Sequence, residues 1–379
     1  MTSRDRTLRL ATRGSDLALR QALSVKDALE TRRRSVELVE VETTGDQIQD
    51  ELIHRLGKTG AFVRSLDQKV LDGEVDAAVH SMKDMPTEMP DDLVVAGVPE
   101  RAAPGDLLVT PGGKTLEELP EGATVGTSSL RRGAQLQAER PDLEIEPLRG
   151  NVDTRIQKLL APGLQREHED RSDADKEQKE NVDDEEYEHP YDRTVEEWFE
   201  DLAEIERLAL ERDVETDYDA VVLAAAGLDR IGLRHHVDAV ALEPDRFVPA
   251  PGQGALAITA RDGETAETIV DAIDHPRTRV ATTVERTVLA TLGGGCIAPI
   301  GVHATLQGSV VRTTVRVLSR DGTEEVAATR DLPVQRHARA ARTFAEDLRE
   351  EGAAELIEQA TREADASATG TREEGADEE

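Results

Sequence analysis

Residues 78–86 read AVHSMKDMP, and this stretch sets the expected fold. The apolar run 77–79 has the composition of a buried strand. It leads at once into polar residues that include Lys83 and Asp84. Because α/β proteins keep their ligands at the carboxyl ends of strands, this stretch predicts a buried strand with a binding site at its end.

The same pattern, a strand followed by a polar turn, recurs along the chain. Short apolar runs alternate with segments of helical period, which is typical of α/β proteins. Expected strands at 8–11, 123–126, 144–148 and 220–223 each lead into a turn or helix start that carries arginine. The arginines that follow these strands are Arg13, Arg131, Arg132, Arg149, Arg155 and Arg230. A guanidinium binds a carboxylate bidentately, so the set predicts a ligand with several carboxylates, although each arginine alone also fits a solvated helix residue.

The charge of the chain argues against several partners. The 379 residues include 46 Lys+Arg and 79 Asp+Glu, a net charge of −33. Such a surface repels the phosphates of nucleic acids and anionic lipid head groups. Phe 4, Tyr 3 and Trp 1 are too few aromatic residues for a base-stacking platform. We therefore expect a small-molecule ligand, with neither nucleic acid nor membrane as a partner.

Cysteine usage and the amino terminus indicate a cytoplasmic protein. The single cysteine, Cys296, excludes an internal disulfide, and no metal site is expected around it. The amino-terminal residues lack the apolar core of a signal peptide, and no stretch approaches the length of about 20 apolar residues that spans a membrane.

The acidic residues are concentrated in two places. Residues 165–217 carry a net charge of −16, and residues 363–379 carry −6. Lysine is scarce, with 8 residues against 38 arginines. Few lysines and many carboxylates favour adaptation to concentrated salt, where charge repulsion is screened within about 3 Å. The alternative is an ordinary acidic protein with an acidic insert and tail.

The acidic insert, about 164–217, divides into two parts. Its first part, up to Pro190, has almost no apolar residues and is expected to be disordered or flexible. The second part, 194–210, has apolar residues at three- and four-residue spacing and predicts one amphipathic helix. That helix either docks on the body of the protein or binds a partner.

Seven ordered motifs resemble one enzyme family. They are ATRGSDLAL (11–19), AVHSMKDMP (78–86), GTSSLRR (126–132), LRGNVDTR (148–155), AAAGLDRIGL (224–233), PAPGQGALAI (249–258) and GGGCIAPIG (293–301). Together they resemble the hydroxymethylbilane synthase, or porphobilinogen deaminase, family. The resemblance spans residues 8 to about 358 and is interrupted by the acidic insert.

The resemblance implies an α/β fold and a domain organisation. Two domains similar to type II periplasmic binding proteins enclose a cleft, and a small α+β domain follows. Domain 1 is expected at 1–102 with 251–272, where the chain returns through a Gly- and Pro-rich crossing. Domain 2 is expected at 103–250 with the insert, domain 3 at 273–360, and a disordered acidic tail at 361–379.

The resemblance also implies the reaction. The family condenses four porphobilinogen molecules head to tail with loss of ammonia, and water then releases hydroxymethylbilane for tetrapyrrole biosynthesis. Each pyrrole carries an acetate and a propionate, which matches the arginine set. The residues similar to the family's substrate contacts are Arg13, Ser15, Phe62, Thr127, Ser128, Arg149, Arg155 and Arg230. Those similar to its cofactor contacts are Lys83, Asp84, Ser129, Arg131, Arg132 and Arg155.

Cys296 and Asp84 are the residues with implied chemical roles. A lone cysteine is more often a buried apolar residue, but the family attaches a dipyrromethane cofactor by a thioether to the matching cysteine. Asp84 alone fits a helix cap or an ion-pair partner of Lys83. In the family the matching carboxylate contacts the pyrrole N–H groups and faces the positive charge that develops as ammonia leaves, so Asp84 is expected to be catalytic.

The remaining expectations concern a loop, the oligomeric state and rival functions. Residues 44–60 resemble a mobile loop over the cleft, but the glycine spacing around Lys58 differs from the family pattern and assigns that lysine no role. The family resemblance favours a monomer. The rival functions are a non-catalytic anion-binding module, which needs neither Cys296 nor Asp84, and an interaction protein built on the insert.

Overall fold

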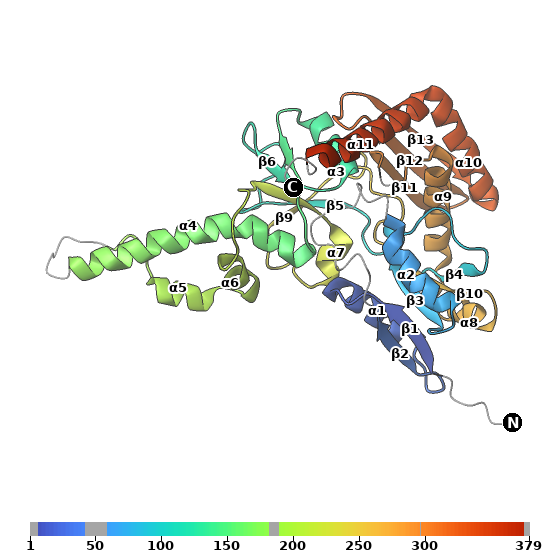
Figure 1. Ribbon diagram of the computed structural model, residues 1–379, viewed down its shortest axis with the longest axis horizontal. Helices are drawn as coiled ribbons and strands as arrows, with labels where there is room; N and C mark the ends of the chain where they lie inside the picture. Colours follow the sequence, from blue (N-terminus) through green and yellow to red (C-terminus); the bar gives the residue numbers. More distant parts are fainter. Residues whose placement is uncertain (1–6, 42–58, 182–188, 296, 375–379) are drawn as a thin grey trace.

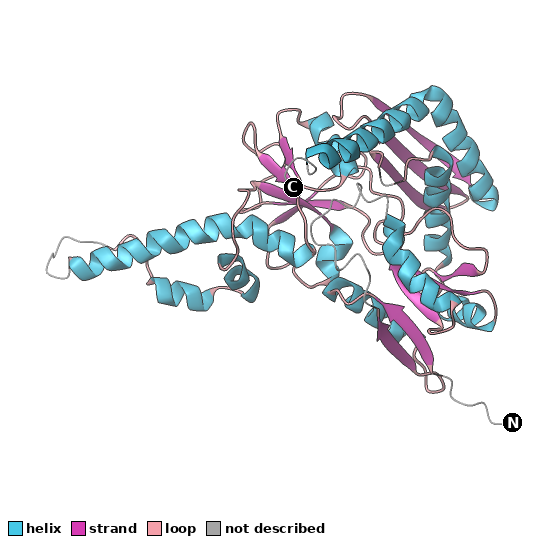
Figure 2. Cartoon of the chain, in the orientation of Figure 1, coloured by secondary structure: helices cyan, strands magenta, loops and turns pink. Residues whose placement is uncertain are grey.

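The computed structural model describes residues 7–41, 59–181, 189–295 and 297–374. Its strands form three sheets, each covered by helices, and a long helical arm projects from one side (Figures 1 and 2). The arm contains part of the acidic insert, and the carboxyl-terminal helices lie over the third sheet.

The first sheet has the order β2-β1-β3-β10-β4. Its strands are β1 (Leu8–Thr12), β2 (Val36–Glu40), β3 (Ala77–Ser81), β4 (Leu93–Gly97) and β10 (Leu256–Arg261). Strands β1, β2 and β3 run parallel, and β10 runs antiparallel to both of its neighbours. Helices α1 (Asp16–Leu29) and α8 (Glu264–Ile273) pack on one face through an apolar cluster that includes Val25 and Ile269, and α2 (Thr59–Leu71) packs on the other through Leu66.

The second sheet repeats this connectivity, with the order β7-β6-β8-β5-β9. Its strands are β5 (Asp106–Val109), β6 (Thr124–Gly126), β7 (Glu144–Glu146), β8 (Ala220–Ala224) and β9 (Ala239–Ala241). Strand β5 is the antiparallel member and occupies the same place as β10 in the first sheet. Helix α3 (Leu130–Glu139) packs on one face, and α4 (Val152–Glu180) and α7 (Ala225–Arg230) pack on the other.

The two antiparallel strands show how the sheets are joined. The chain leaves the first sheet after β4 and enters the second as β5, then returns after β9 as β10. Each sheet thus receives its antiparallel strand directly from a crossing segment. This double crossing and the matching strand orders are the α/β architecture that the motifs predict.

The third sheet is a three-stranded antiparallel meander. Its strands are β11 (Ile300–Gln307), β12 (Val310–Leu318) and β13 (Glu325–Pro333), in sequence order. Helices α9 (Pro276–Leu292) and α10 (His337–Leu348) cover it through a core that includes Val288 and Phe344. This is the small α+β unit expected at the carboxyl end.

The first part of the insert is helical where disorder was predicted. Helix α4 continues as far as Glu180, and residues 182–188 lie outside the described segments. Arg171 explains the difference, because its guanidinium pairs with Glu167 at 2.8 Å and stacks over Tyr191 at 4.3 Å and Trp198 at 5.4 Å. Contacts between distant segments of the insert thus bury one face of a charged helix, which composition alone does not reveal.

The second part of the insert forms two helices where one was predicted. These are α5 (Val195–Asp201) and α6 (Glu204–Leu210). The Glu206 carboxylate accepts a hydrogen bond from the Ala203 backbone N–H at 2.7 Å and starts the second helix. The break lets Trp198 pack within the arm while Ile205 joins the core of the second sheet.

The tail was predicted to be disordered from residue 361, but helix α11 (Ala354–Glu374) extends well into it. Alanine and glutamate dominate its sequence, and both are strong helix formers. Its first turns are anchored in the core of the third sheet by Ile357 and Ala360.

Candidate functional site

The site begins at the turn that follows β3. Strand β3 ends at Ser81, and a single 3₁₀ turn covers Met82–Asp84. Met82 is buried and its N–H donates to the Ala255 carbonyl at 3.0 Å, whereas Lys83 is half-buried and Asp84 is exposed. The turn therefore anchors the apolar Met82 side chain in the interior and presents the Lys83 cation and the Asp84 carboxylate on the side away from it. Among the described residues, none forms an ion pair with Asp84.

Two arginines of the second sheet meet a carboxylate that the sequence analysis did not single out. Arg131 and Arg132 begin α3, and both are buried. Arg131 Nη2 donates to Asp106 Oδ2 at 2.8 Å, and Arg132 donates to Asp106 Oδ1 through Nη2 at 2.7 Å and Nε at 3.1 Å. Arg131 Nη1 also binds the Val248 carbonyl at 2.9 Å, and Arg132 Nη1 binds the Val222 carbonyl at 3.1 Å.

This cluster has strong electrostatic consequences. Burial by itself raises the pKa of Asp106, but the two guanidiniums outweigh it and hold that pKa far below its usual range. Burial lowers the pKa of Arg131, and Asp106 opposes that effect. One carboxylate is thus shared by two guanidiniums, which leaves an excess of positive charge.

Lys83 links the two sheets electrostatically. Burial lowers its pKa, Asp84 opposes this, and Arg132 lowers it further. Asp106 and Arg131 also act on it. Lys83 follows a strand of the first sheet, whereas Asp106, Arg131 and Arg132 belong to the second. The binding edges of the two sheets therefore face each other.

Helices of the two sheets also approach each other here. A Cβ placed on Gly227 in α7 would lie 4.0 Å from Leu17 Cδ2 in α1. Arg230, at the end of α7, donates from Nη2 to the Gly254 carbonyl at 2.8 Å, and burial lowers its pKa. It thus reaches from the second sheet to the crossing that leads back to the first.

Arg155 is the most isolated cation of the set. It lies in the first turn of α4 and donates from Nε to the Gly150 carbonyl at 2.8 Å. Burial, and then the charge of nearby Arg132, lower its pKa to about 10. No described carboxylate forms an ion pair with it. Its remaining N–H groups are suited to an external anion.

The other predicted arginines and hydroxyls lie at the same strand ends. Arg13 follows β1 and Arg149 follows β7, and both are half-buried. The hydroxyls are engaged locally. Ser15 Oγ accepts from Ala18 N at 3.4 Å, Thr127 Oγ1 from Ser129 N at 3.2 Å, and Ser129 Oγ from Arg132 N at 3.5 Å, while Ser128 Oγ donates to the Leu148 carbonyl at 2.8 Å. In this structure they shape the turns that carry the arginines.

A second buried cluster, also not foreseen, joins the crossings to the third sheet. Glu285 of α9 is fully buried and accepts from Arg101 Nη1 at 2.7 Å, Gly252 N at 2.7 Å and Ala304 N at 2.8 Å. Burial alone raises the pKa of Glu285, but Arg101 and His303 lower it below its usual range. The sequence signal for both clusters is an acid inside an apolar segment, APGDLLV for Asp106 and TVERTVL for Glu285.

Several predicted site residues lie outside what the structure describes. Cys296 and residues 44–58 of the predicted loop 44–60, which include Lys58, fall in the undescribed segments, and Thr59 and Gly60 begin α2. Phe62 lies in α2, and its side chain is not among those described.

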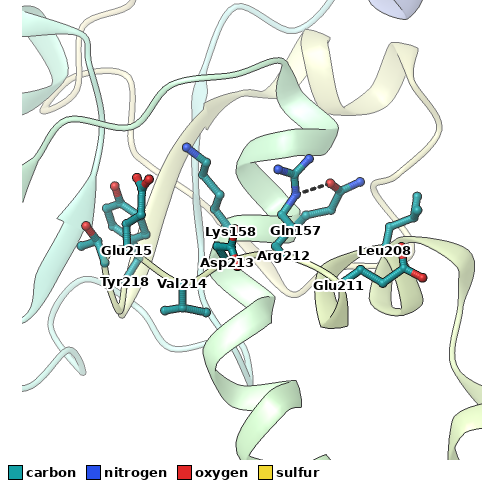
Figure 3. A pocket seen from close by; sticks show the side chains of 10 residues that line it. Gln157, Lys158, Leu208, Glu211, Arg212, Asp213, Val214, Glu215 and Tyr218 are labelled. Carbon is teal, nitrogen blue, oxygen red and sulfur yellow. Dashed lines mark hydrogen bonds between the residues drawn. The ribbon is translucent and has the colours of Figure 1, made fainter. Parts of the chain in front are cut away.

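Within residues 7–41, 59–181, 189–295 and 297–374, there is neither a cluster of three or more potential metal ligands nor a helix long and apolar enough to cross a membrane. A pocket of about 530 Å³ lies where the arm meets the body (Figure 3). Lys158 and Arg212 line it together with three acids, and Arg212 binds Gln157. It includes none of the predicted site residues.

Comparisons with the sequences of known proteins agree on one family. The family model described as "Porphobilinogen deaminase, dipyromethane cofactor binding domain" matches residues 8–167 and 205–268, and the model of the C-terminal domain matches 280–350. A probable porphobilinogen deaminase of Halobacterium salinarum is 55% identical over 391 aligned residues, covering 94% of this chain and 99% of that protein. The porphobilinogen deaminase of Syntrophobacter fumaroxidans is 37% identical, covering 94% and 98%. Among solved structures, the methionine-binding protein MetQ matches with a TM-score of 0.36 at 12% identity, covering 71% of this chain and 90% of that one, which is too low to bear on the fold.

Proposed function

This chain belongs to the porphobilinogen deaminase family, and from this premise we propose how its residues divide the work of the reaction. The activity is that of a hydroxymethylbilane synthase, a transferase that joins four porphobilinogen molecules with loss of ammonia in tetrapyrrole biosynthesis. The observation that carries the residue assignments is the charge cluster at the facing sheet edges. It contains Lys83, Arg131, Arg132 and Arg155 against Asp84 and Asp106.

The residues present fit the dipyrromethane cofactor of the family. Four cations against two carboxylates leave a positive excess, and the acetates and propionates of two pyrroles are the complementary ligands. Arg131 Nε is buried and meets no acceptor among the described residues. When bound, the cofactor supplies the pyrrole to which the first substrate is added. Lys83, Ser129, Arg131, Arg132 and Arg155 would hold its carboxylates.

Asp106 keeps the arginine pair ready for this task. Its carboxylate uses both oxygens on Arg131 and Arg132 and also accepts from Gln253 Nε2 at 2.9 Å. Because the two guanidiniums are fixed before any ligand arrives, little ordering is required on binding.

Substrate binding falls to the outer arginines. Arg13, Arg149 and Arg230 follow β1, β7 and β8. Arg155 serves both ligands. Ser15, Thr127 and Ser128 order the turns beside them, and Phe62 is proposed to pack against pyrrole rings. At high salt the distant surface acids are screened, so these cations act on the substrate at contact distance.

Asp84 is the proposed catalytic residue. Its carboxylate is exposed on a turn whose backbone is fixed on the buried side. It would accept hydrogen bonds from pyrrole N–H groups and stabilise the positive charge that develops on the substrate as ammonia leaves. The same group can take or return a proton at its oxygens.

Cys296 is the proposed attachment point. It follows Gly293, Gly294 and Gly295 at the end of α9, all of which have positive φ. Glycine adopts this backbone readily, so the three glycines that precede Cys296 in the chain leave the helix without strain. The thiolate is the nucleophile that would form the thioether, and its new C–S bond would replace the C–N bond through which porphobilinogen loses ammonia.

The assignments of domains and environment remain part of the proposal. We place domain 1 at 1–102 with 251–272, domain 2 at 103–250 and domain 3 at 273–360. We propose that the enzyme acts as a cytoplasmic monomer and takes no nucleic acid partner. The net charge of −33 supports the last point.

The test is the intact mass of the denatured protein after incubation with porphobilinogen in concentrated KCl. We expect wild type to carry an added mass of two pyrrole units and to release hydroxymethylbilane. Cys296→Ala should show neither, whereas the control Thr291→Ala, on the last turn of α9, should show both. An adduct that survives in Cys296→Ala would overturn the attachment site.

A further inference from the structure

The turn that carries Asp84 is held from behind by an arginine of helix α9. The Arg286 guanidinium donates from Nη2 to the Pro86 carbonyl at 2.6 Å, and from Nη1 to the carbonyls of Met85 at 3.3 Å and Met82 at 3.5 Å. These carbonyls lie on both sides of Lys83 and Asp84 in the chain. Because all three acceptors are backbone atoms, the contact fixes the path of the chain through the turn.

The Arg286 guanidinium is shielded from water, yet its hydrogen-bond partners are backbone carbonyls, which is unusual for a cation. No described carboxylate forms an ion pair with Arg286, and burial lowers its pKa. A guanidinium that loses water without meeting an anion is costly. Arg286 bears this cost, and its N–H groups donate to the turn that presents the catalytic carboxylate. This combination indicates a positional role.

The surroundings make the turn rigid on its buried side. A Cβ placed on Gly252 would lie 2.9 Å from Met82 Cγ and 3.3 Å from Lys83 N, so the return crossing packs closely against the turn. The adjacent helix residue, Glu285, accepts from Gly252 N at 2.7 Å. Successive residues of α9 therefore hold the crossing and the turn.

We propose that Arg286 is a positioning residue that fixes Asp84 by holding the backbone of its turn. The helix that bears Arg286 ends at Leu292, four residues before Cys296. The helix that holds the catalytic turn is thus the one whose chain continues, through three glycines, to Cys296. The inference rests on the proposed role of Asp84.

The experiment is steady-state kinetics of Arg286→Gln on the cofactor-loaded enzyme in concentrated KCl. A misplacement of about 1 Å costs on the order of 100-fold in rate, so kcat is expected to fall about 10- to 100-fold. Arg286 contacts no substrate in this proposal, so KM should change less than about 3-fold while the adduct mass stays intact.

The matched control is Arg279→Gln. Arg279 lies on the same helix and also donates to backbone carbonyls of the first sheet, those of Val95 at 3.2 Å and Ala96 at 3.3 Å, but it does not touch the turn. It should lower thermal stability and leave kcat near wild type. If both variants lower kcat equally, Arg286 is merely a structural contact and the proposal is wrong.

A double-mutant cycle separates this inference from the proposed function. Asp84→Glu keeps a carboxylate in a displaced position, and Arg286→Gln should add little to its loss, because both changes disturb the same geometry. Additive losses overturn the positioning role. A wild-type rate in Asp84→Glu would instead overturn the role of Asp84. If Arg286→Gln does not fold, Arg286→Lys supplies the same comparison, with an intermediate kcat expected and a wild-type kcat counting against the proposal.

Discussion

Replacing Asp106 by asparagine tests whether the buried ion cluster organises the site. Asp106 is 2% exposed and accepts from Arg131, Arg132 and Gln253. Asparagine has nearly the same shape but no charge, and its amide nitrogen places a donor against donors. Two buried guanidiniums would then share no anion.

The magnitude follows from this geometry. Breaking a buried ion pair by removing one partner costs about 3–5 kcal/mol. Against a typical stability of about 5–15 kcal/mol, that is a large fraction of the total. With a denaturant dependence of about 2–3 kcal/mol per molar urea, the unfolding midpoint should fall by about 1–2.5 M.

The assay is urea unfolding in concentrated KCl, since urea leaves the ionic strength unchanged. The control is Asp142→Asn, which removes a bidentate partner of Arg140 at the surface of the same sheet and should leave the midpoint nearly unchanged. Asp106→Asn should also load less cofactor, because Arg131 and Arg132 lose their anchor. Equal midpoints for the two variants would refute the reasoning.

The pH dependence of the same variant has a definite sign. The pKa of Asp106 is far below its ordinary value of 3.8 in the folded state, so its contribution to stability is present above that value and is lost as the pH falls through the lower one. The difference between wild type and Asp106→Asn should therefore be constant near neutral pH and shrink in strong acid. A difference that grows on acidification would contradict the ion pairing.

Three further predictions concern substrate binding and the arm. Arg155→Gln should raise KM at least about tenfold, since one charge-assisted hydrogen bond is worth about 1.5–3 kcal/mol. The control Arg166→Gln, on the exposed side of α4, should not raise KM. Equal KM values for the two variants would remove Arg155 from the binding set. Arg155 is charged below its pKa of about 10, so KM should be stable at neutral pH and rise as the pH approaches that value; a flat profile through pH 10 would contradict this. Replacing residues 168–204, which the family model does not match, by a short Gly–Ser linker should keep kcat within about threefold, because the facing sheet edges do not depend on them. A complete loss of activity in a folded variant would give the arm a role in the reaction.

The sequence by itself determined the fold class and most of the charged groups of the site. Apolar runs that end in HSMKD, TSSLRR and RGNVDTR place the site at strand ends, because chain direction alone puts these residues at the ligand-binding edge of a parallel sheet. The residue types then point to carboxylate ligands, since guanidinium geometry is local chemistry. Helix starts at Ser15 and Ser129 are local in the same sense.

Only the tertiary structure decided how these residues work together. Asp106 meets Arg131 across 25 residues of chain, Glu285 meets Arg101 across 184, and Arg286 reaches Pro86 across 200. No periodicity records such partners, because pairing at this separation depends on how sheets and crossings pack. The same reason made the insert more helical than its composition suggested, whereas the helix of the tail follows from the helix-forming residues of its own sequence. Arg171 gains its helix-stabilising contacts from Tyr191 and Trp198, which a charge count along the chain does not see.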